Sequence, residues 1–148
     1  MSLPTTPSQT VGPFYSIGLC RRTDNELDPD GIELRGTLYD GQGERVPDGM
    51  IEVWDAAARV WGRCGTAEEA GGFRFRVPRH AQVLEVFVFS RGMLWHERTR
   101  IYLRDGEDEV WRRLDDSQRE RLLARREGDA LVFDIRMQGD DATVFFEH

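Results

Sequence analysis

Short segments in which apolar and polar residues alternate, each bounded by turn residues, are the feature that most constrains this fold. The clearest is 73–77, Phe-Arg-Phe-Arg-Val, which follows Gly71 and Gly72 and is closed by Pro78. Alternation with a period of two places every second side chain on the same face of a β-strand. The pattern therefore predicts a half-buried strand at this position, with its apolar face toward a core.

Similar segments recur along most of the chain. The sequence predicts strands at 32–38, 50–55, 73–77, 83–90, 98–103, 131–136 and 143–146, and a loop over 56–72. About seven or eight short strands separated by regular turns are typical of a sandwich of mostly antiparallel strands. We therefore expect an all-β protein with an antiparallel β-sandwich.

A single short helix is expected among these strands. Ser117 and Glu120 have the spacing of a capping box, in which the serine side chain accepts from the first turn and the glutamate reaches back. Leu114 and Leu122 mark one face of this helix, and Gly128 is a plausible stop. The helix would cover one side of the sheet.

The first 31 residues lack the period of a strand. Proline and glycine are frequent there, yet Val11, Phe14, Tyr15 and Ile17 are apolar side chains that need a surface to lie on. We expect residues 1–31 to form an extended N-terminal arm that packs on its own domain or on a neighbouring subunit. Residues 32–148 would then form a single β-sandwich domain, as the total length of 148 residues suggests.

Charge and hydropathy exclude several classes of protein. The net charge of −7 argues against nonspecific binding to nucleic acid or to an anionic membrane. No apolar stretch approaches the roughly 18 residues that cross a bilayer, and no signal peptide is visible. We expect a cytoplasmic protein that binds neither nucleic acid nor membrane, with Cys20 and Cys64 as thiols.

Residue types that commonly carry chemistry are sparse. His80, His96 and His148 have no spacing that would place two of them on one face of a strand. The chain has no nucleophile elbow and no glycine-rich phosphate loop. Two features remain: the segment 6–15, and Arg91, which directly follows an apolar strand and is suited to pair with a carboxylate.

Seven blocks of sequence in a fixed order add a second kind of evidence. They are 6–19 (beginning Thr-Pro-Ser-Gln-Thr-Val-Gly-Pro-Phe-Tyr), 36–43, 51–55 (Ile-Glu-Val-Trp-Asp), 89–92 (Phe-Ser-Arg-Gly), 96–102, 133–139 and 143–146. Together they resemble the intradiol ring-cleavage dioxygenases, and within that family the alpha subunits of protocatechuate 3,4-dioxygenase. The resemblance implies a β-sandwich core and, in the beta subunits, a ferric site held by two tyrosines and two histidines.

The positions that match the family's iron ligands carry other residues in this chain. The histidines would fall near Val83 and Glu85, and one tyrosine would fall within 60–62, where Trp61 is the only aromatic residue. The other tyrosine belongs to a loop for which 75–83 is too short. Valine and tryptophan offer no ligand atom to a ferric ion. We therefore expect no metal and no catalytic residue in this chain, and ferric iron only in a partner beta subunit.

The resemblance also implies residues that line the substrate pocket of the partner. The matching positions are Thr10, Gly12, Pro13, Phe14 and Arg91. The chain would then be an alpha-type, non-iron subunit that completes the pocket of an iron-bearing beta subunit for a catechol-type aromatic acid. Two alternatives stay open: a non-catalytic homo-oligomeric β-sandwich that binds a small ligand or a protein, suggested by the short segments 56–72 and 75–83, and an iron dioxygenase with unfamiliar ligands.

Overall fold

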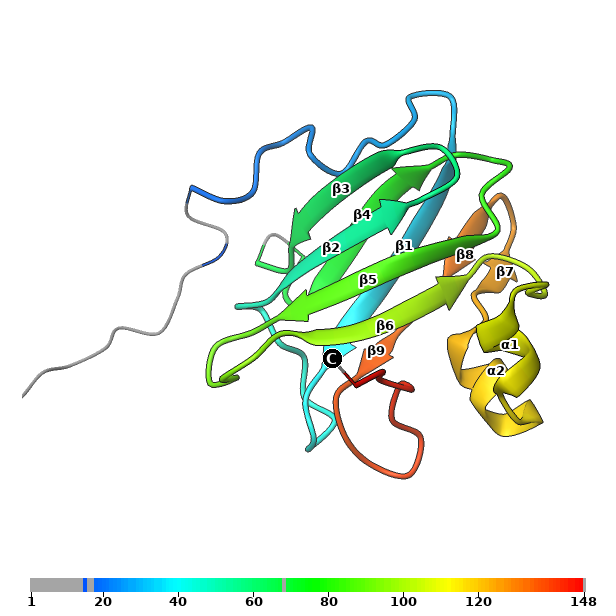
Figure 1. Ribbon diagram of the computed structural model, residues 1–148. Coiled ribbons are helices and arrows are strands. Elements are labelled where there is room, and N and C mark those ends of the chain that lie inside the picture. The colour runs from blue at the N-terminus through cyan, green and yellow to red at the C-terminus, as the bar shows by residue number, and fades with distance from the viewer. Residues whose placement is uncertain (1–14, 16–17, 68, 148) are drawn as a thin grey trace, which may run out of the picture.

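Two β-sheets packed face to face form the body of the computed structural model, which describes residues 15, 18–67 and 69–147 (Figure 1). The first sheet contains β4 (Gly72–Val77), β1 (Ile32–Tyr39), β8 (Ala130–Val132) and β7 (Arg125–Glu127) in this order, and β9 (Ile135–Arg136) also pairs with β1. The second contains β3 (Val60–Gly65), β2 (Met50–Asp55), β5 (Val83–Phe89) and β6 (Glu97–Tyr102). This arrangement confirms the predicted all-β sandwich.

Most strand pairs run antiparallel, as predicted, and the exceptions involve β1. This strand is antiparallel to β4 but parallel to β8 and β9. The predicted strand 131–136 is divided into β8 and β9 because Asp134 leaves the ladder, and its carboxylate accepts from the amide of Thr37 at 3.0 Å. The amide of Phe133 still donates to the carbonyl of Arg35 at 2.9 Å, which keeps both short strands against β1.

The core lies between the inner faces of the two sheets. On β4, Phe73, Phe75 and Val77 are buried whereas Arg74 and Arg76 are exposed, as the alternation predicts. The main partners in this core are Leu34, Leu38, Ile51, Val53, Leu84, Val86, Val88, Ile101, Leu131 and Ile135. Burying one such side chain fully contributes roughly 1.5–3 kcal/mol, so this layer supplies the main driving force for the fold.

The predicted loop 56–72 was wrong, because it contains β3. This strand forms a hairpin with β2, and the carboxylate of Asp55 closes the turn by accepting from the amides of Ala57 and Ala58 at 2.9 and 3.1 Å. The inner position Gly62 carries no side chain, and a Cβ there would lie 2.4 Å from Leu27 Cδ1. The strand shows no apolar alternation because Leu27, from outside the strand, fills this space.

Two short helices replace the single predicted helix: α1 (Glu109–Arg113) and α2 (Asp116–Leu122). A capping box does start α2, but its residues are Asp115 and Gln118 rather than Ser117 and Glu120. The Asp115 carboxylate accepts from the amide of Gln118 at 2.8 Å, and the Gln118 side chain accepts from the amide of Asp115 at 3.0 Å. No helix of the described residues is long and apolar enough to span a membrane.

The end of α2 also differs from the prediction. The helix stops at Leu122, and Gly128 lies beyond it, in the turn between β7 and β8, with a φ of 60°. Leu114 and Leu122 are buried beside Tyr102 in a second, smaller cluster, so the predicted apolar face of the helical region does pack against the sheet.

The prediction of a strand at 143–146 was wrong as well, although this segment lies alongside β6. The amide of Phe146 donates to the carbonyl of Arg98 at 2.8 Å, and the Thr99 hydroxyl donates to the carbonyl of Val144 at 2.7 Å. The segment therefore covers the free edge of β6 through isolated hydrogen bonds.

Residues 18–31 run along two other sheet edges. The amide of Arg63 on β3 donates to the carbonyl of Asp24 at 2.8 Å, and the amide of Leu27 donates to the carbonyl of Arg76 on β4 at 2.9 Å. Covered edges protect a sheet from pairing with other chains. The division into an arm over 1–31 and one domain over 32–148 stays a prediction, since most of residues 1–17 lie outside the described part.

Substitution of Gly36 tests how closely β1 approaches the β8–β9 segment. A Cβ at Gly36 would lie 1.7 Å from the carbonyl oxygen of Phe133 and 2.7 Å from Phe73 Cζ. We expect Gly36→Ala to lower the free energy of unfolding by about 3 kcal/mol, the upper range for overpacking. Urea unfolding followed by tryptophan fluorescence measures this, with Thr37→Ala as the neighbouring control. Equal stabilities for the two variants would contradict the expected clash.

Candidate functional site

The positions at which the resemblance predicts the family's iron ligands lie on one surface, the outer face of the sheet β3-β2-β5-β6. We define this outer face by the outward side chains Glu52, Trp54, Trp61, Arg63, Val83, Glu85, Phe87, Arg98 and Arg100. Neither described helix lies over it, because α1 and α2 pack beside β6 and β7 (Figure 1). The outer face is therefore where the resemblance would place a metal site.

Glu85 is the one carboxylate at a predicted ligand position, and two arginines of β6 hold it. Arg100 Nη2 lies 2.6 Å from Glu85 Oε1, and Arg98 Nη2 lies 3.3 Å from Glu85 Oε2. All three side chains are partly buried, which strengthens the ion pairs relative to pairs in open solvent. Both carboxylate oxygens are therefore engaged by positive charges.

A second ion pair lies one strand further along the outer face. Arg63 Nε donates to Glu52 Oε1 at 2.7 Å, and its Nη1 donates to the carbonyl of Leu19 at 2.8 Å. The Arg63 guanidinium also lies 5.2 Å from the ring centroid of Trp61, a cation–π distance. The carboxylate of Glu52 is thus neutralised within the chain, like that of Glu85.

These observations show that the residues of the outer face do not fit a ferric ion. Val83 and Trp61 provide no ligand atom, and a cation near Glu85 would face Arg98 and Arg100 at close range. Among the described residues, no group of three His, Cys, Asp or Glu side chains is arranged to hold a metal ion. The carboxylates of the outer face, Glu52 and Glu85, are paired with arginines of the same chain.

Arg100 links the outer face to the second core cluster. Its Nη1 lies 3.3 Å from Asp108 Oδ2, and the hydroxyl of buried Tyr102 donates to Asp108 at 3.1 Å. Burial raises the pKa of Tyr102, an effect that the Arg100 guanidinium partly offsets. Asp108 in turn caps α1 by accepting from the amide of Trp111 at 2.8 Å. The network ties β6 to the first helix.

Arg91, the one predicted pocket residue within the described part, lies just beyond the end of β5. Its side chain is 44% exposed, and Nη1 lies 3.1 Å from Asp48 Oδ2. A shallow depression surrounds it, lined by Asp40, Val46, Pro47, Asp48, Ser90 and Gly92. The guanidinium is therefore accessible from solvent. The other predicted pocket residues, Thr10, Gly12, Pro13 and Phe14, lie outside the described residues.

Aromatic rings gather next to Arg91, at the turn between β5 and β6. His96 stacks on Phe89 at a centroid distance of 5.3 Å and meets Phe87 edge-on at 5.5 Å. Tyr15 of the N-terminal segment lies 5.9 Å from Phe89. Sequence reasoning did not associate His96 with these residues, because only the hairpin brings them together. The cluster joins the outer face to the surroundings of Arg91.

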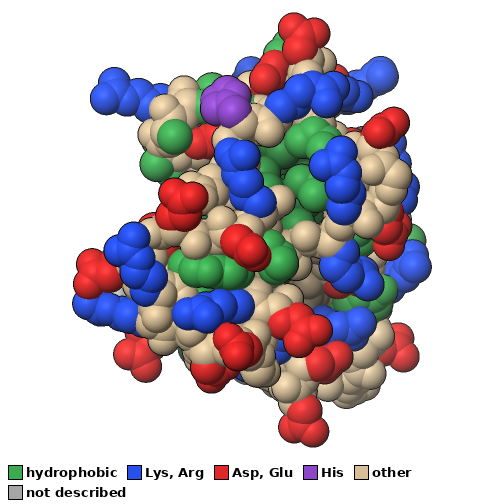
Figure 2. All heavy atoms as spheres, turned by 90° about the vertical axis from the view of Figure 1, so that its right-hand side faces the viewer, with side chains coloured by type: hydrophobic (Ala, Val, Ile, Leu, Met, Phe, Trp, Pro, Cys, Tyr) green, Lys and Arg blue, Asp and Glu red, His purple; other side chains and the backbone are tan. Residues whose placement is uncertain are grey.

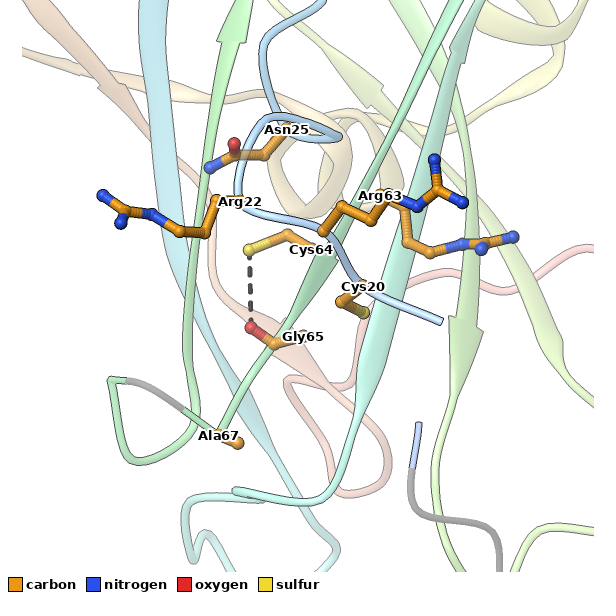
Figure 3. A pocket seen from close by; sticks show the side chains of 8 residues that line it. Cys20, Arg22, Asn25, Arg63, Cys64, Gly65 and Ala67 are labelled. Atoms are coloured by element: carbon orange, nitrogen blue, oxygen red, sulfur yellow. Dashed lines mark hydrogen bonds between the residues drawn. The ribbon is translucent and has the colours of Figure 1, made fainter. Parts of the chain in front are cut away.

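The two cysteines lie near each other, at a small cavity between the N-terminal segment and β3 (Figure 3). Arg22, Asn25 and Arg63 also line it, and the Cys64 thiol donates to the carbonyl of Gly65 at 3.4 Å. Burial raises the pKa of the Cys20 thiol, and the neighbouring Cys64 raises it further. A raised pKa lowers the thiolate fraction, so this arrangement does not describe a reactive cysteine pair.

A wider groove lies on the side of the molecule that carries the helices (Figure 2). Its floor includes Leu123, Ala124, Val132 and Phe133. Its charged rim consists of Arg121, Arg125, Arg126, Arg136, Glu120, Asp134, Asp140 and Asp141. Positive and negative groups are equal in number, so the groove does not select a ligand of one charge.

Comparison with solved structures identifies the fold class of the chain. The fold matches the dioxygenase domain of a dioxygenase–carbohydrate-binding fusion protein from Streptomyces sp. SirexAA-E, with a TM-score of 0.54, 18% identity, and coverage of 90% of this chain and 97% of that one. This likeness establishes the dioxygenase β-sandwich as the fold. No family model matches the chain.

Sequence comparison gives the family. The protocatechuate 3,4-dioxygenase alpha chain of Pseudomonas putida is 33% identical over 195 positions, which cover 98% of this chain and 97% of the relative. The alpha chain of Burkholderia cepacia is 32% identical, with 99% and 98% covered. The chain therefore belongs to the family of protocatechuate 3,4-dioxygenase alpha chains. The alignment is longer than the 148 residues of this chain, so the relatives carry segments that it lacks.

Alkaline unfolding tests the Tyr102 network. Because the folded state raises the pKa of Tyr102, the unfolded state loses this proton first, and stability falls as the pH rises above about 10. Tyr102→Phe cannot lose that proton, so its unfolding free energy should depend less on pH in this range. Urea titrations at several pH values between about 8 and 11 measure the slope. Parallel slopes for the two proteins would refute the assignment.

Proposed function

We propose that this chain is a non-iron alpha-type subunit that completes the substrate pocket of an iron-bearing dioxygenase chain. The main support is its family, since the two relatives described above are named alpha chains of protocatechuate 3,4-dioxygenase. The ion pairs of Glu85 with Arg98 and Arg100 add a physical reason, because they surround the carboxylate at the predicted ligand position with positive charge. Oxygen chemistry would then take place on the partner.

Arg91 is the residue through which this chain would act on the substrate. A guanidinium group binds a carboxylate with two parallel hydrogen bonds, which suits a catechol-type aromatic acid. Arg91 pairs with Asp48 at 3.1 Å, and both side chains of this ion pair are nearly half exposed. Exposed pairs of this kind contribute about 0–1 kcal/mol, so exchanging Asp48 for a substrate carboxylate costs little.

The N-terminal arm would supply the other residues that this chain contributes to the substrate pocket of the partner. The proposed lining residues are Thr10, Gly12, Pro13 and Phe14, carried over from the family resemblance. Tyr15, the next residue, lies against Phe89, two residues before Arg91. This contact supports an arm that passes near Arg91, so that both parts would reach the same pocket of the partner.

A second candidate is a homo-oligomeric β-sandwich that serves no dioxygenase and binds a small ligand or a protein. The observation in its favour is the missing length, because the alignment with the alpha chains runs over 195 positions. Segments that are absent here would remove contacts with a second type of chain. The two candidates differ in what the purified chain assembles with.

Iron content of the purified chain tests the first part of the proposal. We expect a colourless preparation with far less than one iron per chain, even after expression with added iron, because the outer face lacks the ligand set. Absorption spectra and elemental analysis by mass spectrometry measure this. A coloured protein with one tightly bound ferric ion per chain would show instead that the chain is an iron dioxygenase with unfamiliar ligands.

Substitution of Arg91 tests the second part, in a complex with an iron-bearing beta chain. We expect Arg91→Ala to raise KM for protocatechuate about tenfold with little change in kcat, because the lost interaction would hold substrate and transition state alike. Turnover of catechol, which has no carboxylate, should change little. Arg79→Ala, another exposed arginine, is the control.

The same preparation separates the two candidate functions. An unchanged KM in Arg91→Ala would contradict the role of this residue. A stable homo-oligomer of the wild-type chain that fails to bind any co-expressed beta chain, measured by light scattering and affinity co-purification, would favour the second candidate.

A further inference from the structure

The turn before β2 holds the carboxylate that pairs with Arg91. Asp48 lies in this turn, and the residues that flank it bond to Thr66, which is fully buried. The Thr66 hydroxyl accepts from the amide of Gly49 at 2.9 Å and donates to the carbonyl of Val46 at 2.6 Å. The amide of Thr66 also donates to the carbonyl of Gly49 at 3.0 Å. The buried threonine therefore fixes the backbone that carries Asp48, independently of the exposed ion pair.

Arg91 lies on a second turn, the one between β5 and β6. Gly92 continues this turn with a φ of 84°, a conformation that favours glycine, and the amide of Met93 donates to the carbonyl of Ser90 at 3.4 Å. Asp48 comes from a distant part of the sequence, and its carboxylate meets the guanidinium at 3.1 Å. Both residues line the shallow depression described above, and their side chains are nearly half exposed. A ligand in this depression therefore meets the two charges together.

Two carboxylates that bind one guanidinium weaken each other's binding. A substrate carboxylate that reaches Arg91 also approaches Asp48, and the two like charges repel each other. The ion pair with Asp48 also restrains the Arg91 side chain, which would help a ligand to bind. A pair that is nearly half exposed restrains it only weakly, however, because water competes for both groups. Competition between the two carboxylates therefore outweighs the benefit of the restraint.

We propose that Asp48 is a specificity-determining residue, which competes with the substrate carboxylate for Arg91 and thereby sets the affinity for aromatic acids. This inference rests on the proposed function and adds a second residue to the same site. An aromatic acid has to displace Asp48 or bind beside it, and either event costs free energy. A catechol without a carboxylate does neither. Asp48 therefore reduces the advantage that Arg91 gives to an acid over a neutral catechol.

The variant Asp48→Asn tests this competition in a complex of the full-length chain with an iron-bearing beta chain. Asparagine keeps the size of the side chain and an oxygen that can accept from Arg91, so the substitution removes only the charge. We expect KM for protocatechuate to fall about three- to fivefold, the scale of an exposed ion pair, with the change in KM rather than in kcat. The ratio of kcat/KM for protocatechuate to that for catechol should rise by the same factor.

Two further variants separate this competition from other effects of the substitution. Glu127→Gln removes one negative charge and a comparably exposed ion pair, with Arg35 on the opposite sheet, and should leave the ratio at its wild-type value. The double variant Asp48→Asn with Arg91→Ala should have the same KM as Arg91→Ala alone, because without the guanidinium the two carboxylates have nothing to compete for. Circular dichroism melting curves confirm that each variant is folded.

An equal or higher KM in Asp48→Asn, while Arg91→Ala still raises KM, would overturn this inference and leave the proposed function in place. A fall in KM that persists in the double variant would overturn it too, since the effect would not act through Arg91. If Arg91→Ala leaves KM unchanged, this inference fails together with the proposed role of Arg91. If the wild-type chains form no complex, both the inference and the proposed function fail.

Discussion

Packing between the inner faces of two twisted sheets is the constraint on which the rest of this structure depends. Phe73 and Phe75 from one sheet fill the space against Ile51, Val53 and Val86 from the other. Because side chains alternate along a strand, fixing these residues inward also fixes Trp54, Glu85 and Phe87 outward. The outer face, with its ion pairs around Glu52 and Glu85, is thus a consequence of how the core is filled.

The alternation in the sequence was sufficient to predict the sandwich and most of its strands. The prediction of a loop over 56–72 failed because β3 is stabilised by residues distant in sequence rather than by its own apolar alternation. At Gly62, for example, the side chain of Leu27 fills the space on the inner face of the strand. The prediction failed in a similar way at the helices, because Asp115 is as good a cap as Ser117 and only the packing of Leu114 and Leu122 fixes the register. The segment 143–146 reads as a strand but makes only isolated hydrogen bonds to β6.

The candidate site was less predictable than the fold. The sequence offered Glu85 as a possible ligand position through the resemblance alone, and it did not indicate the ion-pair partners of this residue. Glu85 and Arg98 are separated by a hairpin, and nothing in their spacing identifies them as neighbours. The proximity of Asp48 to Arg91 likewise depends on the turn before β2. Electrostatic partners of this kind emerge only once strand register is known.

The two arginines that hold Glu85 also determine what it would take to place a metal ion on the outer face. Introducing Val83→His and Glu85→His would not create a metal centre, because the imidazoles would stand beside Arg98 and Arg100 with no carboxylate left between them. The two guanidinium groups would then repel an incoming trivalent cation. Building a metal site on this face thus requires removing positive charge and adding donor atoms together, and neither change is sufficient alone.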